Sequence, residues 1–357
     1  MVARGVLLLL LALLPAAAGA QTVAEVESAW RGWMTKHDRK AGGLALLHKG
    51  KPVHEAAMGR IAVGTPVPLA SLSKAVTGVC IGGLVDRGKL SFETPLSQAL
   101  AKTLVRIGLP TDQRLSNVTI AQLLTHRAGY DRGSSDPATG PLSTYLLGAT
   151  AKNTAFDDRL KALLRLKLSA APGERYAYTN APYLILGAVV EEASGQDYES
   201  YCKQTVLTPL GATSAALDPA WRILSSYGGW RMTLADYGRF YQAFALGNPV
   251  IGPVARRWMM SADAKSIGGG AHYSLGVDVR PLAGGDANFW HWGRWTYNLS
   301  TGFDGPLVAS YSTFAVRWGP TDANLVAYME PDMAEGSTRN ELDRAMGAAV
   351  GAIKRWP

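Results

Sequence analysis

The sequence predicts an α/β protein of the α+β type. We expect an antiparallel sheet built from both chain ends and flanked by helices, with an all-helical subdomain inserted between its halves. Strand-like patterns gather near the two ends of the chain, whereas helical patterns dominate the middle. Residues 21–357 are also long enough for roughly two domain-sized units, at about 150 residues each.

The N-terminus has the composition of a secretory signal peptide. Arg4 supplies a basic start, an apolar run extends from Val6 to Leu14, and the small residues Ala18-Gly19-Ala20 precede Gln21. This apolar run is shorter than the roughly 18 residues needed to cross a bilayer. We therefore expect a signal peptide over residues 1–20 and an exported protein, periplasmic or secreted, without a stable membrane anchor.

The first part of the predicted sheet follows a short helical stretch at residues 23–36. Two runs between residues 43 and 60, GLALLHK and PVHEAAM, meet around Gly50-Lys51 and are typical of a two-stranded hairpin. Residues 72–85 then carry apolar or small side chains at helical spacing, and Gly88 is well placed to end that helix.

The middle of the chain, from about residue 95 to 260, carries helical patterns and few strand signals. The clearest helical runs are 120–124, 181–193 and 234–246. Strand patterns return at 273–280, 288–297, 310–318 and 324–329, and a helical run at 340–355 follows them. We assign the α/β part to about 21–95 and 265–357, and the helical part to about 96–264, within one domain of residues 21–357.

Composition excludes several function classes. The formal net charge of +8 is scattered along the chain, so nothing resembles a nucleic-acid module. Cys80 and Cys202 are the only cysteines, and their spacing does not suggest zinc. They are either buried free thiols, the simpler interpretation, or a disulfide if the fold brings them together. We expect neither a metal nor an organic cofactor.

Ser71 and Lys74 have the spacing of a nucleophile and its activating base. Residues three apart on a helix lie about 60° apart on one face. A serine hydroxyl is a poor nucleophile at neutral pH, and an amine accepts its proton only if burial or nearby positive charge keeps that amine neutral. A helix N-terminus at Ser71 adds free backbone donors beside the attacking oxygen.

This spacing alone is weak evidence, because Ser200 and Lys203 repeat it. Ser200 stands in a polar helical stretch with no companion motif, so we interpret the second pair as a solvated surface pair. Independent support for Ser71 comes from Tyr178-Thr179-Asn180 and, further along, His291-Trp292-Gly293. A second HxG pattern, His48-Lys49-Gly50, precedes Ser71 and falls in the predicted hairpin turn.

In this order, the elements SxxK, YxN and [KH]xG resemble the serine β-lactamase and penicillin-binding protein superfamily. The resemblance is to the branch of class C β-lactamases, DD-peptidases and family VIII esterases. It extends over most of the chain after the signal peptide, through the segments ASLSKAVTG, LVDRGKLSFETPLSQ, TIAQLLTHRAGY, PGERYAYTNAPYLILGAVVEEASG and GGWRMTLADYGRF. The family fold that this implies, an antiparallel sheet flanked by helices plus an all-helical region, agrees with the pattern of elements above.

The resemblance also implies roles for the motif residues. Ser71 would form an acyl-enzyme, and Lys74 and Tyr178 would share general acid-base duty. Which of these two takes the first proton stays open. Asn180 would bind the substrate and steady the lysine, with His291 as a further substrate contact. The backbone N–H groups of Ser71 and of Arg294, directly after Gly293, would form the oxyanion hole.

Trp292 departs from the family pattern, in which this position is a small hydroxyl residue that contacts the substrate carboxylate. An indole cannot supply that contact, although Arg294 could offer a replacement for an anion. On a strand Trp292 and His291 point to opposite faces, so Trp292 either narrows the site or packs in the core.

The predicted function is therefore hydrolysis of a small-molecule ester, amide or peptide, by an esterase or a D-alanyl peptidase-like enzyme. A β-lactamase ranks below these two because of Trp292. A non-catalytic sensor that binds penicillin or a cell-wall fragment is the alternative from a different class. The intact set of Ser71, Lys74 and Tyr178 argues against that alternative.

Overall fold

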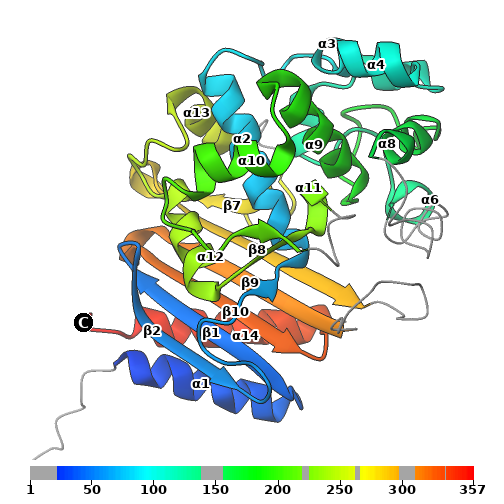
Figure 1. The fold of residues 1–357 in the computed structure, drawn as a ribbon. Coiled ribbons are helices and arrows are strands. Elements are labelled where there is room, and N and C mark those ends of the chain that lie inside the picture. Colours follow the sequence, from blue (N-terminus) through cyan, green and yellow to red (C-terminus); the bar gives the residue numbers. More distant parts are fainter. Residues whose placement is uncertain (1–21, 138–155, 219–224, 262–265, 297–309, 334) are drawn as a thin grey trace, which may run out of the picture.

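The architecture is a seven-stranded antiparallel sheet between two layers of helices (Figure 1). A computed structural model describes residues 22–137, 156–218, 225–261, 266–296, 310–333 and 335–357, so the expected signal peptide lies outside the described residues. The strands follow the order β2-β1-β10-β9-β8-β7-β6. Their bounds are β1 Ala41–His48, β2 Lys51–Met58, β6 His272–Ser274, β7 Val277–Pro281, β8 Ala287–Thr296, β9 Ser310–Trp318 and β10 Ala323–Glu330.

Segments from the two halves of the chain meet in the centre of this sheet. Strand β1 pairs with β10 along its whole length, from Ala41 opposite Glu330 to His48 opposite Ala323. Strand β2 is joined to β1 by the turn at Lys49 and Gly50, both of which have positive φ. The predicted fold class, a sheet assembled from both chain ends and flanked by helices, is confirmed.

Each face of the sheet packs against its own hydrophobic core. Helices α1 (Val23–Lys36) and α14 (Gly336–Gly351) cover one face, where Trp30 and Met34 meet Leu44 and Leu325. The larger core lies on the other face, under α2 (Ser73–Asp86) and α12 (Leu234–Phe240). Helix α2 is buried along almost its entire length, because the sheet lies on one side of it and the helical region on the other.

The helical region follows α2 in the chain. Its described helices are α3 Leu96–Ala99, α4 Ala101–Ile107, α5 Ile120–Leu124, α6 Arg132–Ser135, α8 Phe156–Leu164, α9 Ala181–Ser194, α10 Tyr198–Cys202, α11 Ser225–Gly228 and α13 Pro253–Ser261. The N-terminus of α5 has a capping box between Thr119 and Gln122. Gly195 ends α9 in the left-handed conformation.

The structure corrects two sequence expectations about the strands. Residues 273–280 do not form one strand: Leu275 and Gly276, both with positive φ, turn the chain between β6 and β7. A Cβ atom on Gly276 would lie 2.5 Å from the backbone nitrogen of Ala75, so the turn packs against the start of α2. The middle of the chain also contributes β4 Ala216–Leu217 and β5 Trp230–Met232, which join β3 Val67–Pro68 in a small sheet.

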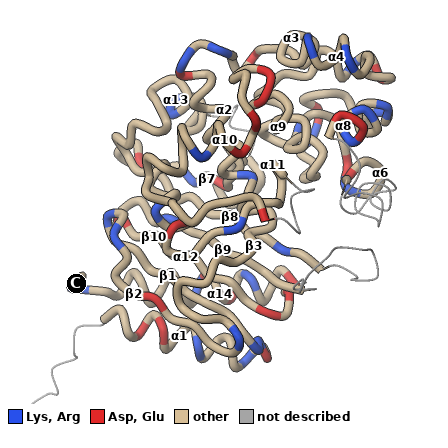
Figure 2. Tube along the Cα trace, viewed as in Figure 1, with Lys and Arg blue, Asp and Glu red and all other residues tan. Residues whose placement is uncertain are grey.

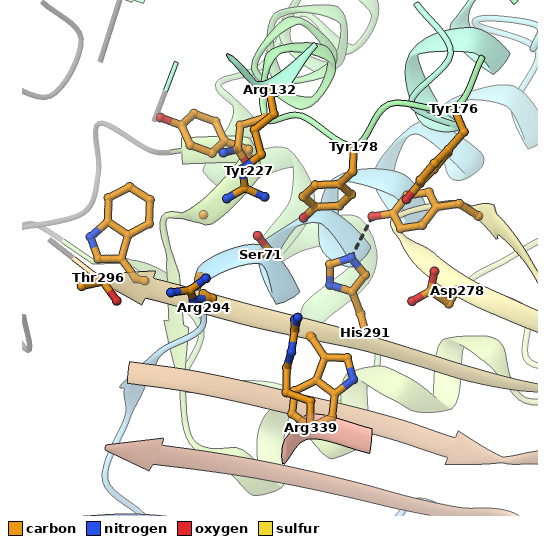
Figure 3. Close-up of a pocket in the computed structure, with 16 residues that line it drawn as sticks. Ser71, Arg132, Tyr176, Tyr178, Tyr227, Asp278, His291, Arg294, Thr296 and Arg339 are labelled. Atoms are coloured by element: carbon orange, nitrogen blue, oxygen red, sulfur yellow. Dashed lines mark hydrogen bonds between the residues drawn. The ribbon is translucent and has the colours of Figure 1, made fainter. Parts of the chain in front are cut away.

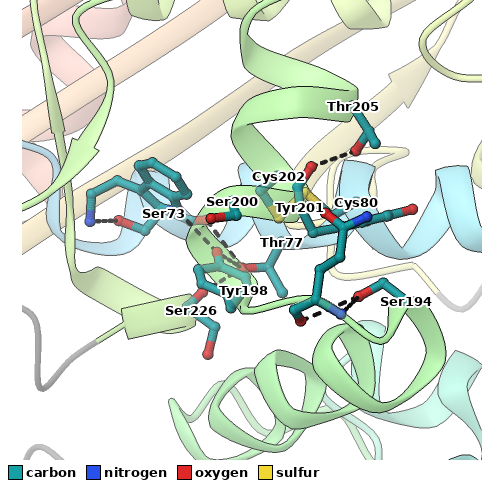
Figure 4. The surroundings of a disulfide bond; sticks show 12 residues. Ser73, Thr77, Cys80, Ser194, Tyr198, Ser200, Tyr201, Cys202, Thr205 and Ser226 are labelled. Carbon is teal, nitrogen blue, oxygen red and sulfur yellow. Dashed lines mark hydrogen bonds between the residues drawn. A yellow bond between two sulfur atoms is a disulfide. The ribbon is translucent and has the colours of Figure 1, made fainter.

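Cys80 and Cys202 form a disulfide, so the interpretation of both as free thiols is wrong (Figure 4). The bond links α2 to the end of α10, and both cysteines are fully buried. Cys80 lies on the side of α2 that faces away from Ser71, as its position nine residues later predicts. The sequence could not decide the pairing because 122 residues separate the two cysteines.

Charged residues are spread over the molecule with both signs interspersed (Figure 2). Among the described residues, no helix is long and apolar enough to cross a membrane. The same residues contain no group of three or more His, Cys, Asp or Glu side chains arranged to hold a metal ion.

Candidate active site

Ser71 lies in a 3-10 turn, Ala70–Leu72, directly before α2. Ser71 therefore lies two residues before the first residue of α2, Ser73. Ala70 adopts a φ of 48°, a left-handed conformation that is strained for a residue with a Cβ atom. The turn leaves Ser71 partly exposed at the edge of a cavity, while its neighbours Ala70 and Leu72 are buried.

Lys74 lies behind Ser71 in the first turn of α2 and is completely buried. Its Nζ is 3.0 Å from Ser71 Oγ, 2.6 Å from Asn180 Oδ1 and 3.1 Å from the carbonyl oxygen of Tyr227. Burial lowers the pKa of Lys74 from its usual value near 10.5 to about 7, although the carboxylate of Asp136 opposes this shift. A substantial fraction of the amine is therefore neutral at physiological pH.

Asp136 fixes the side chain of Asn180, which precedes α9. This buried carboxylate follows α6 and accepts hydrogen bonds from the backbone N–H of Asn180 (2.7 Å) and from its Nδ2 (3.0 Å). It also accepts one from Thr179 Oγ1 (2.9 Å). Because Nδ2 donates to Asp136, the carboxamide oxygen of Asn180 points toward Lys74.

Tyr178 places its ring beside the lysine. The Nζ atom of Lys74 lies 5.0 Å from the centroid of the Tyr178 ring. Burial raises the pKa of Tyr178 above its usual range, although a hydrogen bond with Ser71 opposes the shift. At neutral pH the phenol therefore keeps its proton, and Lys74 has the lower pKa of the two candidate bases.

Strand β8 carries the third motif along the edge that faces Ser71. His291 is buried and turns toward the helical region, where its Nε2 is 3.0 Å from the hydroxyl of Tyr273. Burial lowers the pKa of His291 to about 3, so the imidazole is neutral. Trp292 points to the opposite face and stacks on Phe314, with ring centroids 4.0 Å apart. The expectation of opposite faces is confirmed, and Trp292 packs in the core while also lining the cavity.

Gly293 allows β8 to approach the nucleophile closely. A Cβ atom at this position would lie 2.6 Å from the carbonyl oxygen of Leu69 and 3.2 Å from the backbone nitrogen of Ser71, and it would overlap the hydroxyl of Thr313. Only glycine fits here without moving backbone. The next residue, Arg294, lines the cavity, and its guanidinium donates to Asp332 with Nε at 2.7 Å. The side chain of Arg294 is therefore already paired, which weakens its expected role as a substrate anion contact.

These residues enclose a cavity of about 610 Å³, and Ser71 lies in its wall (Figure 3). The lining residues come from the 3-10 turn Ala70–Leu72, from the segment before α9, from β6, β7 and β8, and from α6, α11 and α14. Figure 3 shows Arg132 and Arg294 on one side of Ser71, and Asp278 on the other side, beyond His291.

The structure therefore places Ser71 and Lys74 together with Tyr178, Asn180 and the HWG segment, as the sequence predicted. It leaves the second HxG pattern in the β1–β2 turn and Ser200 exposed on α10. Sequence reasoning missed several groups at the site: Asp136, the Tyr227 carbonyl, Tyr273, Asp278 and the arginines at positions 132 and 339. No motif marks them, because they reach the site from separate elements of the fold.

Comparison with known proteins agrees with this geometry. A model of the Beta-lactamase family matches residues 26–316. Esterase EstB from Burkholderia gladioli is 32% identical over 186 residues, a stretch that covers 48% of this chain and 42% of EstB. Protein flp from Staphylococcus aureus (strain COL) is 29% identical over 151 residues, covering 42% of this chain and 27% of that protein. The matched stretch thus spans less than half of the length of either relative.

Solved structures share the whole fold. A D-stereospecific amidohydrolase from Streptomyces sp. superposes with a TM-score of 0.71 at 16% identity, covering 90% of this chain and 98% of that one. An octameric penicillin-binding protein homologue from Pyrococcus abyssi superposes with a TM-score of 0.68 at 20% identity. The match covers 94% of this chain and 79% of that one. The resemblance inferred from the three motifs is confirmed, and the chain has the fold of these solved structures. The chain belongs to the beta-lactamase family.

Proposed function

We propose that this protein is a serine hydrolase that forms an acyl-enzyme at Ser71 and hydrolyses a small-molecule ester or amide. One observation carries the proposal: a fully buried lysine with a pKa of about 7 lies 3.0 Å from the hydroxyl of a partly exposed serine at the edge of the cavity. A general base is most effective when its pKa lies near the working pH.

Lys74 is the first base in this proposal, and Tyr178 carries the proton onward. Ser71 Oγ bonds to the substrate carbonyl carbon as its proton passes to Lys74 Nζ. The carbonyl oxygen becomes an oxyanion between the backbone N–H groups of Ser71 and Arg294. The bond to the leaving group then breaks, and that group takes the proton from Lys74 through the hydroxyl of Tyr178. Water releases the acyl group by the reverse transfers and restores Ser71.

The substrate class is argued from the HWG segment. His291 is neutral and Trp292 lacks a hydroxyl, so this segment offers neither a cation nor a small donor to a substrate carboxylate. An ester is therefore the first choice. An amide of a D-amino acid is the second, because the fold neighbours include a D-stereospecific amidohydrolase and a D-amino acid amidase. A β-lactam ranks below both.

Serine-directed labelling tests the proposal. We expect a fluorophosphonate probe to label the wild type and the Ser200→Ala variant equally, and to leave Ser71→Ala unlabelled. Hydrolysis of p-nitrophenyl acetate should follow the same pattern. Labelling by fluorescent penicillin without turnover of p-nitrophenyl esters, D-amino acid amides or nitrocefin would instead identify the non-catalytic sensor. Turnover that survives in Ser71→Ala would overturn the assignment of the nucleophile.

Export to the periplasm or the medium remains part of the proposal. The composition of residues 1–20 supports it, and the disulfide between Cys80 and Cys202 is compatible with an oxidising compartment. N-terminal sequencing of the protein recovered outside the cytoplasm should begin at Gln21. Recovery of the full-length chain from the cytoplasm alone would contradict export.

A further inference from the structure

Asp278 is the one acidic side chain among the described residues that line the catalytic cavity. It lies on β7, opposite Tyr273 of β6 and opposite Trp290 of β8. No hydrogen bond or ion pair to its carboxylate is found within the described ranges of the chain. Arg280, the cation whose charge acts on Asp278, donates to the carbonyl oxygen of Gly269 at 3.1 Å, and its guanidinium lies 4.9 Å from the centroid of the Trp290 ring.

The Asp278 side chain is partly exposed in the wall of the cavity, where little water reaches it. Burial raises the pKa of Asp278 to about 7, and only Arg280 opposes the shift. Charges that are removed from water without a partner destabilise a protein, whereas the same charge gains a partner when a cation binds. A cationic group bound in the cavity would therefore give this carboxylate a charged partner.

Aromatic rings surround this carboxylate. Tyr176 and Tyr273 line the same part of the cavity, with ring centroids 6.3 Å apart, and Tyr178 meets Tyr273 edge-on at 6.1 Å. The neutral imidazole of His291 completes the wall. Tyrosine faces beside a carboxylate are the chemistry that recognises a quaternary or primary ammonium group.

The position of Asp278 relative to the proposed acid identifies which part of the substrate reaches it. The leaving group must contact Tyr178, from which it takes its proton. Tyr178 lies beside His291 and Tyr273, and Asp278 lies beyond them (Figure 3). Arg132 and Arg294 lie on the other side of Ser71. A cationic leaving group that points toward Asp278 therefore lies away from these two arginines, while Arg339 lies below Ser71 in Figure 3.

We infer that this site takes substrates whose leaving group carries a cationic ammonium centre, such as esters of amino alcohols, and that Asp278 with Tyr176 and Tyr273 binds that centre. The inference rests on the proposed function, since it names the substrate class of the same site. It adds a specificity residue that no motif in the sequence marks.

An isosteric pair of thioesters tests the inference. Acetylthiocholine and S-(3,3-dimethylbutyl) thioacetate differ only by nitrogen in place of carbon, and they give the same acetyl-enzyme. At pH 8, where the Asp278 carboxyl is largely ionised, we expect kcat/KM for acetylthiocholine to be about tenfold higher, the size of one charge-assisted contact. In Asp278→Asn the ratio should fall to about one.

The control Asp38→Asn removes the same charge from an exposed side chain and should keep the tenfold ratio. A wild-type ratio near one, or a ratio unchanged in Asp278→Asn, overturns the inference. If Asp278→Asn does not fold, inhibition of the wild type replaces that test. Choline should inhibit the hydrolysis of p-nitrophenyl acetate more strongly than 3,3-dimethylbutanol does. Equal inhibition by the two alcohols overturns the inference. Failure of the proposed function itself gives a different result, because the wild type would then hydrolyse neither of the two thioesters nor p-nitrophenyl acetate.

Discussion

The same four-residue spacing occurs twice in this protein, at Ser71–Lys74 and at Ser200–Lys203, with different surroundings. Lys74 is completely buried and its Nζ contacts Ser71, Asn180 and the Tyr227 carbonyl. Ser200 is exposed on α10, and its backbone N–H donates to the N-cap carboxylate of Asp197 (Figure 4). Lys203 is half-exposed where α10 gives way to a π-helical stretch, Lys203–Leu207.

The difference shows what spacing can and cannot do. Spacing brings a serine and a lysine to one side of a helix, but it leaves the amine charged if water surrounds it. Burial beneath α9 and α11 lowers the pKa of Lys74 to about 7, and Asn180 Oδ1 accepts a hydrogen bond from its amine. The chain therefore contains its own control for the proposed site.

The largest effect should come from replacing Lys74 with methionine, and the same replacement of Lys203 is the matched control. We expect Lys74→Met to lower kcat/KM for p-nitrophenyl acetate by about 10³-fold, since it removes the proposed general base. Lys203→Met should remain within about twofold of the wild type. Thermal unfolding of both variants checks that they are folded. Equal losses in the two variants would remove the distinction between the two regions.

A smaller loss is expected from the carboxylate that positions Asn180. Asp136→Asn places an amide against the donors of Asn180 and Thr179, so kcat/KM should fall by about 10²-fold through misplacement of the lysine. Because the charge of Asp136 raises the pKa of Lys74, that pKa should be lower in Asp136→Asn. The fall of kcat/KM on the acid side of the pH profile, the acid limb, should therefore occur at lower pH in this variant.

The matched control is Asp197→Asn, which changes the corresponding carboxylate beside Ser200. It should leave both the rate and the pH profile unchanged. If Asp136→Asn is slower than the wild type but its acid limb lies at the same pH, Asp136 has only a structural role and does not influence the pKa of Lys74.

The pH dependence of the wild type gives a further, smaller effect. Protonated Lys74 cannot accept the serine proton, so kcat/KM should fall about tenfold for each unit below pH 7 and level off above it. Initial rates with p-nitrophenyl acetate from pH 5 to 9 measure this limb. If kcat/KM instead keeps rising up to pH 9, as expected for a lysine with the ordinary pKa near 10, burial does not lower the pKa of Lys74.

The smallest effect on activity concerns the disulfide, which ties the helix of Lys74 to the helix of Ser200. Replacing both cysteines, in Cys80→Ala with Cys202→Ala, should lower the free energy of unfolding by about 2–4 kcal/mol, because the unfolded chain loses a cross-link. Activity at 25 °C should stay within about twofold, since Cys80 faces away from Ser71. An unchanged urea midpoint would show that the bond contributes no stability.

The sequence by itself determined the sheet from two chain ends and the residues of the three motifs. Local patterns carry this information: a strand-like run at 310–318, helical spacing in 181–193, and triplets in a fixed order. The sequence also separated Ser71 from Ser200, because only Ser71 has companion motifs at the expected distances along the chain.

The tertiary structure alone decided the features that depend on distant segments. It paired Cys80 with Cys202, broke residues 273–280 into a hairpin against α2, and brought Asp136 to Asn180 and Asp278 to the cavity. A carboxylate has no local pattern that marks its partner, and a pKa depends on how much water the surrounding elements exclude. For that reason only the fold distinguishes Lys74, whose buried amine has a pKa of about 7, from the half-exposed Lys203.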